Sequence, residues 1–311
     1  MEGFLAVARQ VAILFVLMAV GAAMRRLRLL SAEAVGGLVN LLILVVTPCL
    51  IVDVFQRPYD PSLLRGLALA FLVSSAVHLV SIAAARALVR HRDGNVRRPL
   101  LLAAVFSNAG FMGLPLEQAV LGEAGVFYGA VYVTVFNLFI WSWGVRTMGA
   151  EGGAGRVRLA KMAVNPGTFG LALGLPLFFL SWRLPEAVAT PVHLLAGLNT
   201  PLAMIVIGHC LWGARLGRVV RMGAVYVAAF LRLVGCPLAV LGALAPFRAS
   251  LDRNLALALV IAASAPAAAM VSMFAAKFGR DVEVSVAVVS GTTFLSVLTM
   301  PAVIALALRI F

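Results

Sequence analysis

Charged residues are scarce in this chain. They make up 12% of its 311 residues, whereas 63% are hydrophobic, and the mean hydropathy is +1.05. A soluble domain is nearer half apolar and a quarter charged, so a soluble globular fold is excluded. The composition indicates an integral membrane protein. Because a helical span takes roughly 20 apolar residues plus a short loop, the length suits about ten spans.

Residues for metal binding and nucleophilic catalysis are also few. The chain has three cysteines and four histidines, and no CxxC or Cys/His spacing suggests a metal. It lacks HExxH, a GxSxG in a catalytic context and an acidic pair. We therefore expect no enzyme, no metal and no cofactor. Basic residues outnumber acidic ones, 25 to 12, but no basic run is interleaved with aromatics, so nucleic acid is not an expected partner.

Long apolar runs without strand-length alternation predict an all-α integral membrane fold. The first run is long enough to span and follows Glu2 rather than a basic segment, so it is expected to be a helix and not a cleaved signal peptide. We predict ten transmembrane helices over residues 4–24, 35–56, 63–89, 99–121, 124–147, 162–181, 190–213, 219–245, 254–277 and 283–308.

Basic residues are concentrated in the loops that follow odd-numbered spans. Because cytoplasmic loops carry an excess of Lys and Arg, these loops are predicted to be cytoplasmic and both termini to lie outside. The residues concerned are Arg25, Arg26, Arg28, Arg86, Arg90, Arg92, Arg97, Arg98, Arg146, Arg156, Arg158, Lys161, Arg215, Arg218, Arg221, Lys277 and Arg280.

The chain divides into two halves of five spans. An odd number of spans makes the second half enter the membrane from the opposite side, so the repeats are expected to be inverted. They cover residues 1–148 and 161–311, and a glycine-rich stretch at 149–160 joins them as a short cytoplasmic linker. Thr47-Pro48 in span two and Thr200-Pro201 in span seven support this correspondence.

Gly/Pro-rich segments interrupt spans four and nine at matching places, 106–115 and 263–266. Ser107 and Ser264 are separated by the same interval as Gly122 and Gly279. An ordinary proline kink is the simpler alternative for either segment alone, but the matching register of the two disfavours it. An unpaired backbone group in a bilayer costs several kcal/mol, so broken helices occur where protein or a cavity covers them. A matched pair of broken spans is the best sequence indication of a transporter's binding site.

The broken spans predict an anion site. A helix that restarts inside the membrane presents free amide donors and the positive end of its dipole. Spans four and nine run antiparallel, so the two restarts are expected to converge on one small volume. For Asn108 a purely structural capping role is the alternative. The candidate substrate-binding residues are Ser107, Asn108, Gly110, Gly113, Pro115, Ser264 and Pro266.

Other polar residues inside the spans are candidates for a substrate path or for coupling, with protons as the coupling ion. They are His78, Glu117, Asn137, Arg232 and Thr292. Arg232 lies near the middle of span eight, where it either bonds backbone carbonyls or serves substrate or gating. For the hydroxyls and amides, interhelical hydrogen bonds are the alternative. No carboxylate lies near the middle of a span, which suits an organic anion better than a cation.

Several segments of the chain are similar to those of the auxin efflux carrier family, which includes bacterial organic-anion permeases and the plant PIN-formed auxin exporters. The stretch 107–116 is similar to the family's Asn-x-x-x-x-Gly-Ile-Pro-Leu segment, and Asn165-Pro166, the stretch 200–204 and the run 263–301 are also similar. The resemblance implies two inverted five-helix repeats with broken helices four and nine crossing at the midplane, as in bile-acid symporters and sodium–proton antiporters. It also implies a scaffold of spans 1, 2, 6 and 7 that forms a homodimer, a mobile domain of spans 3–5 and 8–10, and elevator-type transport without ATP.

In the plant members the crossing segments bind the anionic substrate, and the matching positions here are Asn108, Pro115 and Pro266. Ala265 stands in the second break where Asn108 stands in the first, so auxin itself is not implied. Sodium-coupled bile-acid-type symporters share the architecture, but residues 262–273 contain no Asp, Glu, Asn or Gln, which ranks sodium below protons or uniport.

The expected function is a secondary active transporter of a small organic anion, a carboxylate, in a bacterial inner membrane. The sodium-coupled symporter remains one alternative, and a membrane-embedded ligand sensor without flux is another. A channel is a third. The sequence leaves the substrate, the direction of transport and the coupling ion open.

Overall fold

The computed structural model describes residues 2–149, 166–212 and 221–311. These residues are almost entirely helical, and their only β-type pairing is an isolated bridge between Ser107 and Ala267. The predicted linker, apart from Gly149, lies outside the described residues. So do several of the basic residues that the orientation argument used, namely Arg156, Arg158, Lys161, Arg215 and Arg218.

The first half of the chain contains eight α-helices and three short π-helical segments among its described residues. In order they are α1 (Glu2–Arg26), α2 (Ala32–Leu41), η1 (Leu42–Val46), α3 (Thr47–Phe55), α4 (Pro61–Leu88), α5 (Gly94–Val105), η2 (Ala109–Gly113), α6 (Leu114–Leu121), α7 (Glu123–Phe139), η3 (Ile140–Gly144) and α8 (Val145–Gly149).

The second half is likewise helical in its described residues. Its elements are α10 (Pro166–Phe179), α11 (Glu186–Gly197), α12 (Asn199–Leu211), α13 (Gly223–Phe230), η5 (Leu231–Gly235), α14 (Cys236–Leu244), the 3₁₀ turn η6 (Ala245–Phe247), α15 (Arg253–Ser264), α16 (Met270–Lys277) and α17 (Val282–Ile310).

Every one of the ten predicted ranges is largely helical where the structure describes it. Six helical segments of the described chain are long and apolar enough to cross a membrane: Glu33–Phe55, Pro61–Leu88, Glu123–Gly149, Glu186–Cys210, Gly223–Phe247 and Val282–Ile310. The all-helical membrane fold that the composition predicted is thereby confirmed.

Four of the acidic residues serve as helix caps. Asp60, Asp93, Asp252 and Asp281 each accept a hydrogen bond from a backbone amide two or three residues further on, at 2.8–3.0 Å, at the start of α4, α5, α15 and α17. Such caps satisfy amides that have no partner inside the helix and also complement the helix dipole. Asp93 and Asp252 cap the same element in each half.

Three of the π-helical segments precede a proline. Pro48, Pro115 and Pro237 are each the second residue of the helix that follows η1, η2 and η5. Proline has no N–H, and its ring collides with the carbonyl four residues before it. Widening the turn to a π-helical one relieves that collision without ending the helix, as is usual where π-bulges occur.

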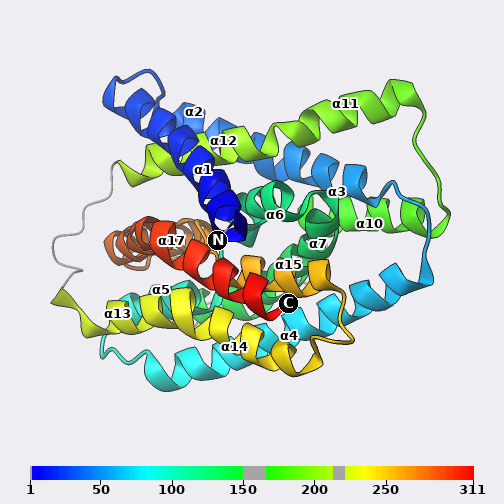
Figure 1. The fold of residues 1–311 in the computed structure, drawn as a ribbon. Helices are drawn as coiled ribbons and strands as arrows, with labels where there is room; N and C mark the ends of the chain where they lie inside the picture. The colour runs from blue at the N-terminus through cyan, green and yellow to red at the C-terminus, as the bar shows by residue number, and fades with distance from the viewer. Residues whose placement is uncertain (1, 150–165, 213–220) are drawn as a thin grey trace.

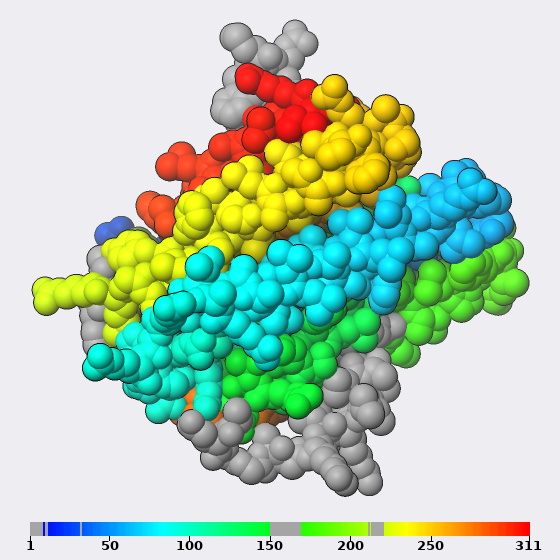
Figure 2. Space-filling view, turned by 90° about the horizontal axis from the view of Figure 1, so that it is seen from below, coloured from blue at the N-terminus to red at the C-terminus, as the bar shows by residue number. Residues whose placement is uncertain are grey.

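The helices form two groups. The first group, α1, α2, α3, α10, α11 and α12, is held together by the contacts of α1 with α12 and of α3 with α10 and α11. The second group contains α4–α8 and α13–α17. Figure 1 shows the first group along one side of the molecule and α4, α5, α13 and α14 along the other. In Figure 2 helix α4 lies across the surface of the second group beside α13 and α14.

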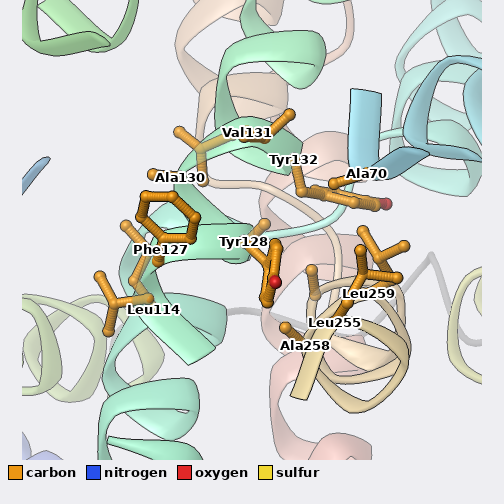
Figure 3. Close-up of a cluster of buried hydrophobic side chains, with 14 of the residues drawn as sticks. Ala70, Leu114, Phe127, Tyr128, Ala130, Val131, Tyr132, Leu255, Ala258 and Leu259 are labelled. Atoms are coloured by element: carbon orange, nitrogen blue, oxygen red, sulfur yellow. The ribbon is translucent and has the colours of Figure 1, made fainter. Parts of the chain in front are cut away.

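Helix α7 lies at the centre of the second group. It packs between α4 and α15, where Tyr132 lies beside Ala70 and Tyr128 faces Leu255 and Leu259 (Figure 3). Phe127 also contacts the first group, because its ring centroid is 4.7 Å from that of Phe55 on α3. Helix α7 therefore links the second group to α3 and α10 of the first, while α1 and α12 meet the second group at α6 and α17.

Helices α1 and α12 approach so closely that only glycine fits between them. A Cβ placed on Gly208 would lie 1.8 Å from the carbonyl oxygen of Met18, and one on Gly21 would lie 2.0 Å from that of Ile205. Small residues allow backbones in a membrane to approach in this way, and packing then holds the pair together.

Replacing Gly208 with alanine is expected to force these two helices apart. Overpacking of this kind costs about 1–3 kcal/mol, so the melting temperature of the purified protein in detergent should fall. Gly242→Ala on α14 is the matched control, since a Cβ there has nothing within 4 Å, and it should be neutral or slightly stabilising. Equal melting temperatures for Gly208→Ala and the parent protein would show that the α1–α12 contact is not tight.

Candidate functional site

Two helices are interrupted at the predicted places. Helix α5 ends at Val105, Phe106 has extended backbone angles (φ −95°, ψ 112°), and helical structure resumes at Ala109. Helix α15 ends at Ser264, Ala265 is extended (φ −61°, ψ 147°), and helical structure resumes at Met270. The expectation of a break in each half, rather than a simple kink, is confirmed.

The two interrupted segments pair with each other. The amide of Asn108 donates to the carbonyl of Pro266 at 2.7 Å, and the amide of Ala268 donates to that of Phe106 at 2.9 Å. These bonds form the antiparallel bridge between Ser107 and Ala267. Each broken helix thus supplies partners for backbone groups of the other. We call this unit, residues 106–108 with 265–268, the paired break.

The glycines that follow the breaks also match. Gly122 and Gly279 have φ values of 65° and 62°, in the left-handed region that side chains disfavour. Each lets the chain leave its second half-helix in the same way. The two glycines at matching sequence positions therefore share a positive φ.

Arg232 stabilises the paired break from the side of α15 and η5. The side chain is fully buried. Its guanidinium donates to the carbonyl of Val105 at 2.6 Å and also to the carbonyl of Ala263. These carbonyls belong to the last turns of α5 and α15, where helices have unpaired acceptors and a partial negative charge. Of the two alternatives for Arg232, bonding to backbone carbonyls is the one that the structure contains.

Polar and aromatic side chains extend this support. Ser107 Oγ donates to the hydroxyl of Tyr132 at 3.4 Å, and Thr292 Oγ1 accepts from the amide of Ala267 at 3.1 Å while donating to the carbonyl of Val288. His78 bonds the carbonyl of Ser74 through Nδ1 and stacks on Phe139, with ring centroids 5.2 Å apart. Thr292 and His78 therefore lie behind the paired break, in the packed interior.

A cavity of about 360 Å³ opens on the other side of the paired break. Asn108, Gly110 and Phe111 line it from the first break, and Ala268, Ala269 and Met270 line it from the second. Both restarting half-helices therefore face one volume. Ile43, Leu44 and Thr47 from the first helix group complete the wall, together with Val133, Phe136, Asn137, Trp141, Met273, Phe274 and Lys277.

The predicted site residues divide between the cavity and its support. Ser107, Asn108, Gly110 and Asn137 line the cavity, and Asn137 donates from its amide to the carbonyl of Val133 at 2.9 Å. The remaining predicted residues do not line it.

Those remaining residues have structural surroundings. Ser264 bonds the carbonyl of Ile261 in its own helix at 2.8 Å, and Gly113 allows α6 to approach Ala262. Pro115 is a buried early residue of α6, and Pro266 takes part through its carbonyl. Glu117 is fully buried, away from the cavity lining.

The sequence did not single out Lys277 for the site. It is an exposed residue in the last turn of α16 that also lines the cavity. In the sequence it counted only as a basic loop residue. Its position eleven residues after Pro266, in the apolar run that follows the second break, was the available signal. The aromatic wall of Trp141 and Phe274, with centroids 5.4 Å apart, was also missed, because aromatic residues are common throughout the spans.

Broken helices that pair inside a helical membrane fold, beside a cavity, define a membrane transport protein. The chain belongs to the family described as membrane transport protein, whose model matches residues 6–159 and 154–304. It is also similar to an uncharacterized transporter of Methanothermobacter thermautotrophicus, with 28% identity over 289 residues that cover 92% of this chain and 93% of the relative. The expectation of a membrane transport family is thereby confirmed, and membership in a transporter family agrees with the expectation that the chain is not an enzyme.

Removing the guanidinium of Arg232 is expected to destabilise the fold. Each hydrogen bond to a charged group contributes about 1.5–3 kcal/mol, so Arg232→Met should cost about 3–6 kcal/mol. Arg232→Lys should fall in between, since a single ammonium lacks the planar fork that reaches two carbonyls. Thermal unfolding in detergent measures the effect, and Arg248→Met, at an exposed arginine, is the control. Equal stability of Arg232→Met and Arg248→Met would contradict this role.

Proposed function

We propose that this protein is a secondary carrier for a small organic anion, a carboxylate, which binds in the cavity beside the paired break. The proposal rests mainly on one observation, which is that both broken helices resume beside the same cavity. The first amides of each restarting helix have no acceptor within the helix, and the positive ends of two dipoles point at the same volume. Such ends bind anions in many proteins.

Asn108 adds a directional group to this site. Its backbone amide is used by the paired break, but its side-chain amide has no hydrogen-bond partner among the described residues. An amide has two donors and an acceptor. A carboxylate in the cavity would accept from that amide and from the free amides at the restart, which begins at Ala109.

The charge of the cavity wall also favours an anion. Among the described residues that line it, Lys277 is the charged one, and none is acidic. The rest of the wall is apolar and aromatic, which suits the hydrocarbon part of an organic acid. Inorganic anions would leave this apolar surface unused.

We further propose ten spans in two inverted repeats, with both termini outside, and elevator-type alternating access. The cavity lies between the two helix groups, because Ile43, Leu44 and Thr47 come from the first and the other lining residues from the second. In this mechanism the second group carries the substrate past the first. The first group acts as the scaffold and the contact surface for a homodimer.

Asn108→Ala is expected to weaken binding of the transported carboxylate about ten- to hundredfold, since it removes a hydrogen bond to a charged group. A panel of mono- and dicarboxylates is screened by thermal shift, and the best ligand is then tested for uptake or exchange in proteoliposomes. Asn254→Ala, at an amide outside the cavity lining, serves as the control. Unchanged affinity and exchange in Asn108→Ala would remove the paired break from the binding site.

Lys277→Gln is expected to reduce the affinity for the same anion by about two- to fivefold, as is typical for an exposed charge. The difference from the parent protein should shrink as salt is raised, because salt screens exposed charges. Isothermal titration at low and high salt measures both effects. A Lys277→Arg variant that binds like the parent would show that the charge matters, whereas a loss in Lys277→Arg equal to that in Lys277→Gln would refute a charge effect.

A further inference from the structure

Glu117 is an acidic residue whose burial no hydrogen bond or ion pair among the described residues explains. Four aspartates cap helices. Asp53 pairs with His193 at 2.9 Å, and Glu123 pairs with Arg57 at 3.6 Å near the surface. Glu117, by contrast, has no exposed surface, and neither carboxyl oxygen has a hydrogen-bond partner among the described residues.

Gly129 makes the room for this carboxyl group. Glu117 projects from α6 against α7, where a Cβ on Gly129 would lie 1.6 Å from its Oε2. Its Oε1 lies 3.9 Å from the position of a Cβ on Gly113, one turn back towards the paired break. Gly129 therefore provides the space for the carboxyl, with Gly113 at ordinary contact distance, and Ala262 of α15 lies close to Gly113.

The titratable groups of α7 and α15 are engaged elsewhere. On α7, Tyr128 points at Gly66 of α4, and Tyr132 accepts from Ser107. Glu123, the first residue of α7, is paired with Arg57 and largely exposed. On α15, Arg253 is an exposed residue of the first turn.

The charged groups of α1 and α12, which also contact α6, are directed away as well. Arg9 is exposed, Arg25 donates to the carbonyl of His209, and Arg26 lies over the ring of Trp212. His209 bonds the carbonyl of Leu30 through Nε2. Cys210 is exposed, and η2 carries no titratable residue.

We propose that Glu117 is a proton-binding site and that its protonation is linked to binding of the anion at the paired break. An ionised carboxylate without a counter-charge or donors is very costly to bury, whereas the neutral acid is tolerated. Glu117 is therefore protonated in this conformation. The proton comes from water when a movement of the bundle exposes the carboxyl, and it leaves by the same route.

The linkage follows from the position of Glu117 on the helix that restarts at Ala109. The start of that helix faces the cavity, and Glu117 reaches back towards it. An ionised Glu117 would place a negative charge behind the amides that bind the anion and so oppose binding. A protonated Glu117 leaves the helix end free for the substrate, and by reciprocity the bound anion favours the protonated form. This inference rests on the proposed function, and it makes the carrier a proton–anion symporter.

A metal cation is a poorer occupant of this place. Hard cations such as calcium and magnesium take six or more oxygen ligands, and the residues found close to the carboxyl oxygens are Gly113 and Gly129. These residues offer no side-chain oxygen. A single proton satisfies the carboxyl without any other ligand.

Infrared spectroscopy of the purified full-length protein tests the protonation directly, without any substrate. The carbonyl stretch of a protonated carboxylic acid should be present at neutral pH and shift in heavy water. It should be lost in Glu117→Gln and kept in Glu123→Gln, the matched control at the exposed partner of Arg57. Should Glu117→Gln fail to fold, Glu117→Met supplies a neutral side chain of similar length. A spectrum unchanged by either Glu117 variant would overturn the assignment.

Isothermal titration of the best carboxylate from the thermal-shift screen, across a pH series, tests the linkage. The parent protein should lose about tenfold in affinity as the pH is raised through the titration of Glu117, a size usual for coupled sites, with uptake of a proton on binding. Glu117→Gln should bind tightly at every pH tested. Parallel pH profiles of the two proteins would refute the linkage but leave the carrier function standing.

Absence of carboxylate binding in both proteins would instead refute the proposed function, and the linkage with it. The melting temperature of the parent protein in sodium and in potassium is the last measurement. It should be the same in both, and a stabilisation by sodium that disappears in Glu117→Gln would overturn the assignment of a proton.

Discussion

The structure depends on one constraint, which is that a helix interrupted inside an apolar environment must find partners for the backbone groups it frees. Neither broken helix solves this alone. The amides of Asn108 and Ala268 donate across to the opposite segment, and Thr292 accepts from Ala267. Because each break completes the other, both must be present together, and this explains why interruptions occur at equivalent places in the two halves.

Arg232 determines how charge is distributed across the paired break. Its guanidinium bonds carbonyls at the ends of α5 and α15, so the negative ends of two helix dipoles are neutralised by one cation. The positive ends of the restarting helices are left facing the cavity. Arg232 thus neutralises the negative helix ends on one side of the paired break, and a bound anion would neutralise the positive helix ends on the other side. A lysine has only a point charge, whereas the planar fork of arginine reaches two acceptors at once.

The sequence predicted the features that depend on local chemistry. The Gly- and Pro-rich interruptions and their matching register were visible in it, as were the approximate helix ranges. Of the predicted site residues, Ser107, Asn108, Gly110 and Asn137 line the cavity, but the rest of the lining was not predicted, because it depends on how two distant segments face each other. Gly113, Pro115, Ser264 and Pro266 were expected at the site but lie outside the cavity lining. Lys277 was missed for the same reason, and the role of Arg232 stayed open because its acceptors are backbone carbonyls from two other helices.

The proposed elevator-type mechanism requires one helix group to move against the other as a body. Within the first group, Gly21 and Gly208 allow backbone contact between α1 and α12 that a single methyl group would disrupt. Across the cavity, by contrast, that group contributes Ile43, Leu44 and Thr47, which are apolar apart from one hydroxyl. Apolar contacts have no preferred direction, so a sliding surface made of them loses few specific bonds at each step. Polar groups that hold the paired break lie inside the second group and would move with it. The same fold can therefore keep a binding site rigid while its access changes.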